Sequence, residues 1–168
     1  MARVPLGQLT NYDAPGENAK PPKLLLAVGH PPAVADAILS LFRTLVKGSV
    51  GIRERKLATL AVAAEAGNTY EWGHHATSAL DLGITAVEVE SIKSHTTGVL
   101  SERDQLTVDF ARAVERGAVT DELWTNVSGR YELDELVQLT VISGYYGMLA
   151  RIQEALDVEQ DLGIAGSS

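Results

Sequence analysis

The chain has 168 residues, of which 45% are hydrophobic and 21% are charged, and its formal net charge is −8. These values indicate one globular domain with enough length for a hydrophobic core, and the acidic balance argues against nucleic acid or an anionic membrane as a partner. The absence of cysteine excludes disulfides, thiolate metal ligands and thiol nucleophiles, and the lack of a signal peptide or a membrane-spanning apolar stretch leads us to expect a cytoplasmic protein.

The chain begins with a segment rich in proline and glycine, residues 1–23, which we predict to be an extended arm lying on the body or on a neighbouring subunit. Residues 24–157 are predicted to form a helical domain and residues 158–168 a tail. Within the domain, apolar residues at helical spacing between Val34 and Leu45 predict a first helix that ends at Gly48.

Six further helices are predicted from apolar spacing, capping residues and terminating glycines. They are expected over about residues 53–66 and 70–82, from Thr85, which forms a capping box with Glu88, from Ser101 to Gly117, from Thr120 to Gly129, and over about residues 133–156. The helix at 53–66 is nearly all apolar and is expected to lie centrally. Because no alternating strand pattern of useful length is present, the predicted fold class is all-α, a bundle of about six to eight helices.

One segment, residues 70–75, carries most of the chemistry, and it reads Tyr-Glu-Trp-Gly-His-His. Glu71 and His75 are four residues apart and share one helix face, so the carboxylate can fix the imidazole tautomer and raise the pKa of His75. Such a pair can transfer protons near neutral pH. The same spacing also occurs on exposed helix faces with no catalytic role, so both interpretations stay open at this point.

A metal site is the third interpretation of this segment, because Glu71, His74 and His75 are all possible ligands. Adjacent histidines diverge by about 100° on a helix, so both cannot easily reach one ion. No second cluster in the sequence completes a ligand shell. We therefore predict neither a metal nor another cofactor.

Several short runs of the sequence, taken together, match the pattern of a known family: Arg53–Leu57, Val62–Ala64, Gly67–His75, Gly83–Thr85 and Ser143–Ala150. They resemble the carboxymuconolactone decarboxylase family of the alkylhydroperoxidase D-like superfamily, over about residues 24–157. The Tyr-Glu-Trp-x-x-His core is the most specific part of this resemblance. It implies a fold that is an alkylhydroperoxidase D-like helical bundle.

Related alkylhydroperoxidase D-like proteins carry a Cys-x-x-Cys motif followed by a histidine, and their peroxidase reaction needs a thiolate and a resolving thiol. In this sequence Asn68 and Glu71 stand at the cysteine positions, and His75 stands at the histidine position. The resemblance therefore indicates a cysteine-free member that is not a thiol peroxidase.

The activity that the resemblance implies is loss of carbon dioxide from a carboxylated lactone, without a cofactor, in a homotrimer or hexamer. His75, with His74 beside it, would supply the proton, and Glu71 would orient His75. The further residues expected to bind substrate or steady an oxyanion are Tyr70, Trp72, Lys56, Asn68, Tyr145 and Tyr146.

Lys56 departs from the wider family, whose members often carry a glutamate of the proton relay at this position. Lys56 could bind a substrate carboxylate, or the decarboxylase activity could be absent.

The leading hypothesis is thus a cofactor-free lyase or isomerase that acts by proton transfer on a small acidic carbonyl or lactone compound. The alternatives are a helical oligomer that binds a small molecule or serves as a scaffold without catalysis, and a metal-dependent enzyme that uses Glu71 and His75. A pocket that holds both adjacent histidines, a tyrosine and a carboxylate would favour the enzyme, whereas a closed apolar pocket would favour the binding protein. Apolar surface on the helix at 70–82 and on the last helix predicts a homo-oligomer.

Overall fold

The computed structural model describes residues 2–9, 12 and 20–161. Over these ranges the chain forms eight α-helices and no strand, which confirms the all-α class. The helices are α1 (Lys23–Ala27), α2 (Pro32–Val46), α3 (Ile52–Glu65), α4 (Thr69–Asp81), α5 (Ala86–Ser94), α6 (Glu102–Arg116), α7 (Asp121–Ser128) and α8 (Leu133–Leu156). None of the helices in these ranges is long and apolar enough to cross a membrane.

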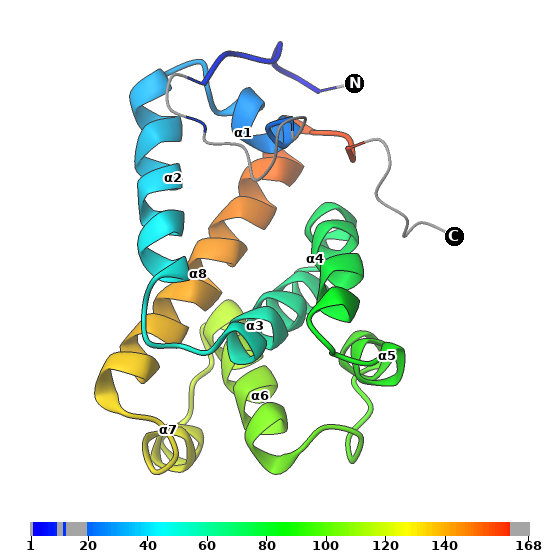
Figure 1. Cartoon of the computed structure of the whole chain (residues 1–168), viewed down its shortest axis with the longest axis vertical. Coiled ribbons are helices and arrows are strands. Elements are labelled where there is room, and N and C mark those ends of the chain that lie inside the picture. Colours follow the sequence, from blue (N-terminus) through cyan, green and yellow to red (C-terminus); the bar gives the residue numbers. More distant parts are fainter. Residues whose placement is uncertain (1, 10–11, 13–19, 162–168) are drawn as a thin grey trace.

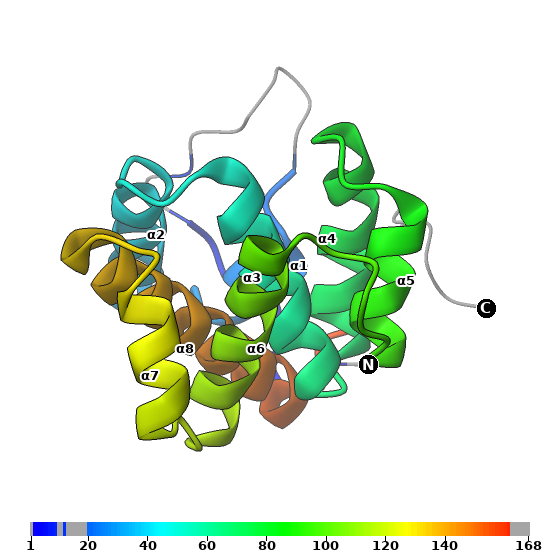
Figure 2. The ribbon, with the colours of Figure 1, turned by 90° about the horizontal axis from the view of Figure 1, so that it is seen from below.

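Helix α3 lies at the centre of the bundle, as the sequence predicts (Figures 1 and 2). It packs against α4, α5, α6 and α8, and every residue from Leu57 to Ala63 is buried. A helix that is apolar all round needs neighbours on all sides. Because α3 is central, a side chain from one of its turns can reach a site that the surrounding helices enclose.

The long helix α8 crosses the molecule from α7 to the end where α1 lies (Figure 1). Its inner face buries Leu136, Leu139 and Ile142 against the shared core. The outer face carries Leu133 and Val137, which are 69% and 54% exposed. Helix α8 therefore contributes both to the core and to an apolar surface.

The turn between α3 and α4 positions the two helices so that they pack together. Gly67 adopts a φ of 62°, a left-handed conformation that side chains other than glycine rarely adopt. Asn68 then caps α4, because its side-chain oxygen accepts a hydrogen bond of 2.9 Å from the backbone N–H of Glu71. Thr85 and Glu88 form the predicted capping box at the start of α5.

The described parts of both chain ends pack onto the helices of the body. Helix α1 lies where the sequence predicts no helix, and its Leu24 and Ala27 are buried in the core. Residues 2–9 lie on the body of the same chain, where the N–H of Arg3 donates to the carbonyl of Leu156 and that of Gly7 to the carbonyl of Leu26, each at 2.8 Å.

The predicted tail is also partly packed. Val158 is 2% exposed, and the following residues up to Asp161 contact α1 and α4. Residues 162–168 of the tail, and residues 1, 10–11 and 13–19 of the arm, lie outside the described ranges.

Candidate active site

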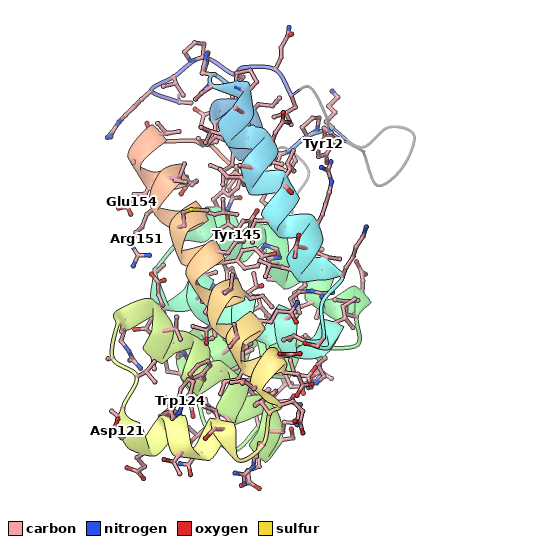
Figure 3. The ribbon with its side chains drawn as sticks, turned by 90° about the vertical axis from the view of Figure 1, so that its left-hand side faces the viewer. Tyr12, Asp121, Trp124, Tyr145, Arg151 and Glu154 are labelled. Atoms are coloured by element: carbon pink, nitrogen blue, oxygen red, sulfur yellow. The ribbon has the colours of Figure 1, made fainter. Side chains whose placement is uncertain are left out.

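A cavity of about 450 Å³ lies where α3, α4 and α8 face α1 and α2. Its wall is mainly apolar or aromatic, and Figure 3 shows Tyr145 projecting from α8 toward α2. The polar or ionisable side chains in the lining are Tyr12, Arg43, Lys56, Tyr70, Glu71, His74, His75, Ser78, Tyr145 and Tyr146. The two adjacent histidines, a carboxylate, a lysine and several tyrosines therefore converge on one space.

Three of these side chains form a chain across two helices. Lys56 of α3 places its Nζ 3.0 Å from Nδ1 of His75 on α4, and His75 Nε2 lies 3.4 Å from Oε2 of Glu71. Lys56 Nζ also donates to Ser78 Oγ at 3.0 Å. Because a protonated lysine can only donate, His75 Nδ1 accepts and Nε2 carries the ring proton, which faces the carboxylate.

Burial has the largest effect on the pKa values of His75 and Lys56 in this chain of groups. It lowers the pKa of His75, and the nearby Lys56 lowers this pKa further, while Glu71 partly opposes the change. Glu71 therefore raises the pKa of His75, as the sequence analysis expects, but burial outweighs this effect and the net pKa falls. Burial, with a smaller effect from the Arg55 cation, also lowers the pKa of Lys56 to about 8.

Two tyrosines of α8 close the aromatic side of the cavity. The rings of His75 and Tyr146 meet edge to face, with centroids 5.0 Å apart, and Tyr145 packs edge to face on Tyr146. Burial, with the charge of Glu71, raises the pKa of Tyr146 to about 12, and it also raises the pKa of Tyr145. Both phenols therefore stay protonated as hydrogen-bond donors at neutral pH.

A second polar cluster lies around His74. Its Nε2 lies 2.8 Å from Oδ2 of Asp161, and the hydroxyl of Tyr70 donates to the same oxygen at 2.8 Å. The other oxygen of Asp161 accepts from the backbone N–H of Lys23 at 3.1 Å, while the backbone N–H of Leu24 donates to the Tyr70 hydroxyl oxygen. The sequence analysis missed Asp161, because it lies in the predicted tail and is 87 residues from His74.

The two adjacent histidines thus face different partners, as their angular separation on a helix requires. His74 contacts Asp161, while His75 contacts Lys56 and Glu71. Within residues 2–9, 12 and 20–161, no three histidine, aspartate or glutamate side chains are arranged to hold a metal ion.

Seven of the nine residues that the sequence analysis proposes for the site line the cavity, and two do not. Asn68 instead bonds α8, where it donates to the carbonyl of Ala150 and to the side chain of Gln153. Trp72 faces α5, where the Lys93 ammonium lies 5.7 Å from its ring centroid. For these two residues the structure indicates a role in helix packing.

The sequence matches the carboxymuconolactone decarboxylase family over residues 32–100. The match covers this segment of the chain alone. It contains α2 to α5 and therefore Lys56, Glu71 and both adjacent histidines. No curated protein matches the sequence.

Solved structures show the same fold at low sequence identity. An uncharacterized peroxidase-related protein from Silicibacter sp. TM1040 superimposes with a TM-score of 0.77 at 16% identity, over 87% of this chain and 80% of that one. A cysteine-to-alanine variant of the debrominase Bmp8, in complex with 2,3,4-tribromopyrrole, gives 0.75 at 19% identity, over 84% and 78%. An uncharacterized peroxidase-related protein with an alkylhydroperoxidase AhpD core, from Ralstonia eutropha JMP134, gives 0.74 at 15% identity, over 85% and 78%. These similarities confirm an alkylhydroperoxidase D-like fold.

Proposed function

We propose that this protein is a cofactor-free lyase or isomerase that moves protons on a small, acidic carbonyl or lactone compound. The observation that supports this most is the contact of His75 with Lys56 on one side and Glu71 on the other, at the edge of a cavity with aromatic walls. An imidazole between a donor and an acceptor is arranged to pass protons. The cavity volume of about 450 Å³ suits one small-molecule ligand.

In the proposed reaction His75 acts as a relay. It gives its Nε2 proton to the substrate and takes a proton from Lys56 at Nδ1, so no imidazolium has to persist in the buried site. The lowered pKa of Lys56 makes its ammonium a stronger acid than an exposed lysine, which brings this transfer closer to balance. Glu71 holds the Nε2–H tautomer through its nearby carboxylate.

The protonated tyrosines would hydrogen-bond the oxygen on which negative charge develops. Tyr145 and Tyr146 both line the cavity on the α8 side, and the edge of the Tyr146 ring fixes the plane of His75. Lys56 would also attract the acidic group of the substrate into a wall that is otherwise apolar.

The non-catalytic alternative rests mainly on lysine at the relay position. Lys56 lies 3.0 Å from His75 Nδ1, so it takes part in the same polar chain and does not interrupt it. This contact favours the enzyme over a binding protein without catalysis.

The test uses two histidines of the same chain. His75→Asn removes the relay, and the matched control His95→Asn changes an exposed residue in a left-handed conformation that asparagine tolerates. Turnover would be screened on small lactones, β-keto acids and intermediates of aromatic degradation. We expect His75→Asn to lower kcat/KM by about 100-fold or more, with little change for His95→Asn. Full turnover by His75→Asn would refute the proposal.

A further inference from the structure

The amine of Lys56 has an unusual setting among the lysines of this chain. It lines the cavity and contacts two neutral groups, His75 Nδ1 and Ser78 Oγ, both at 3.0 Å. No salt bridge joins it to a carboxylate of the described ranges. Lys47 and Lys93, in contrast, are exposed. A partly buried ammonium without an anionic partner is costly, so its position calls for a function.

The groups around Lys56 favour its neutral form. Arg55 on the same helix adds a positive charge, and burial removes water, and together they lower the pKa of Lys56 to about 8. Roughly a tenth of the amine is therefore neutral at pH 7 and roughly half at pH 8, against well under a hundredth for an exposed lysine. The other titratable groups that face this part of the cavity are Arg43, Glu71, His75, Tyr145 and Tyr146.

We propose that Lys56 is a nucleophile that forms an imine with the carbonyl of a small β-keto acid, with His75 as the group that carries its protons. The geometry fits this role, since the amine lines the cavity while its proton acceptor touches it from the neighbouring helix. The inference rests on the proposed function and adds to it a substrate class and a covalent step.

The step balances without an oxidant or a reductant. The amine nitrogen attacks the carbonyl carbon, and the carbonyl π pair moves to oxygen. Both amine protons then pass by way of His75 to that oxygen, which leaves as water. Protonation of the imine nitrogen by solvent gives an iminium.

The iminium then serves as the electron sink for decarboxylation. The bond between the α-carbon and the carboxylate breaks, its electron pair forms an enamine, and carbon dioxide leaves. His75 supplies a proton to the enamine carbon, and water hydrolyses the iminium and restores the amine. When carbon dioxide leaves, the bound molecule loses its negative charge inside a cavity whose wall is mainly apolar. The surroundings therefore favour the product over the substrate.

A trapping experiment tests the covalent step without relying on turnover. The wild-type protein would be incubated at pH 8 with acetoacetate, and separately with benzoylacetate, in the presence of sodium cyanoborohydride. Peptide mass spectrometry would then compare reductive alkylation of Lys56 with that of the exposed Lys47. We expect Lys56 to be labelled at least about tenfold faster with one of the probes, because more of its amine is neutral. Equal or slower labelling of Lys56 with both probes would overturn the inference.

Variants separate this inference from the proposed function. Lys56→Arg keeps a positive charge beside His75 but removes the nucleophile, and Lys47→Arg is the matched control. We expect that Lys56→Arg forms no trapped adduct and that its kcat/KM falls by about 100-fold or more. Thermal unfolding, followed by circular dichroism, checks that this variant folds. If Lys56→Arg keeps turnover while His75→Asn loses it, the proton-transfer function stands and the imine is refuted. If the adduct forms but His75→Asn keeps full turnover, the proposed function fails instead.

Discussion

Replacement of Lys56 by methionine is expected to stabilise the protein at neutral pH, although it removes two hydrogen bonds. The pKa of Lys56 falls from an ordinary 10.5 to about 8 on folding. The unfolded chain therefore binds more protons than the folded chain between pH 8 and pH 10.5, so stability rises with pH across that window. Below it, the folded protein bears the full cost of holding a partly buried ammonium.

The size of this cost follows from the two pKa values. At pH 7 the wild type is less stable by about 3 kcal/mol than it would be with a neutral group at this position, and at pH 9.5 by about 1 kcal/mol. Methionine has a similar length and no charge, but it loses the contacts to His75 and Ser78, which contribute about 1 kcal/mol together. We therefore expect Lys56→Met to gain about 2 kcal/mol at pH 7 and almost nothing at pH 9.5.

Urea unfolding of both proteins at the two pH values measures this difference. Lys47→Met, at an exposed lysine, is the control and should show no change in its effect between the two pH values. If Lys56→Met destabilises the protein equally at both, the amine is not strained by burial, and the reasoning about its neutral form is refuted. The expected outcome is a more stable but inactive protein, the usual relation at a functional site.

Two further predictions concern the tail and the assembly. Asp161→Ala should lower the free energy of unfolding by about 2 kcal/mol, since it leaves Tyr70 and His74 without their shared acceptor. Asp81→Ala, at an exposed aspartate, is the control, and equal effects of the two substitutions would contradict the assigned contacts. We also predict a homo-oligomer held in part by the outer face of α8, so light scattering should give a multiple of 17.9 kDa for the wild type and a smaller assembly for Val137→Lys; a monomeric wild type at micromolar concentration would refute this.

The helices could be predicted from the sequence wherever local chemistry fixes them. Thr85 and Glu88 cap α5 through contacts three residues apart, and Gly67 ends α3 through its own backbone conformation. Helix α1 is different, because its five residues are too few for a recognisable period and are stabilised by burial of Leu24 against distant helices.

The site could be predicted only in part, for the same reason. Glu71 and His75 are four residues apart, so their pairing follows from the helix period. Spacing does not reveal how deeply the pair is buried, and burial outweighs the effect of Glu71, so the net pKa of His75 falls. Trp72 is one residue from Glu71, and this step of about 100° turns it toward α5 and away from the cavity. Asp161 has no local signal, since its contacts within the described ranges are with segments far away in the sequence.

The lysine at position 56 decides which ring nitrogen of His75 accepts a hydrogen bond and which one carries the proton. A neutral imidazole has one N–H and one bare nitrogen, so it needs a donor on one side and an acceptor on the other. Lys56 supplies the donor at Nδ1, and Glu71 lies on the acceptor side at Nε2. A glutamate at position 56 together with Glu71 would place acceptors at both nitrogens, which only a protonated ring can serve. The lysine is therefore consistent with the lowered pKa of His75, to which burial contributes most and the charge of Lys56 contributes less.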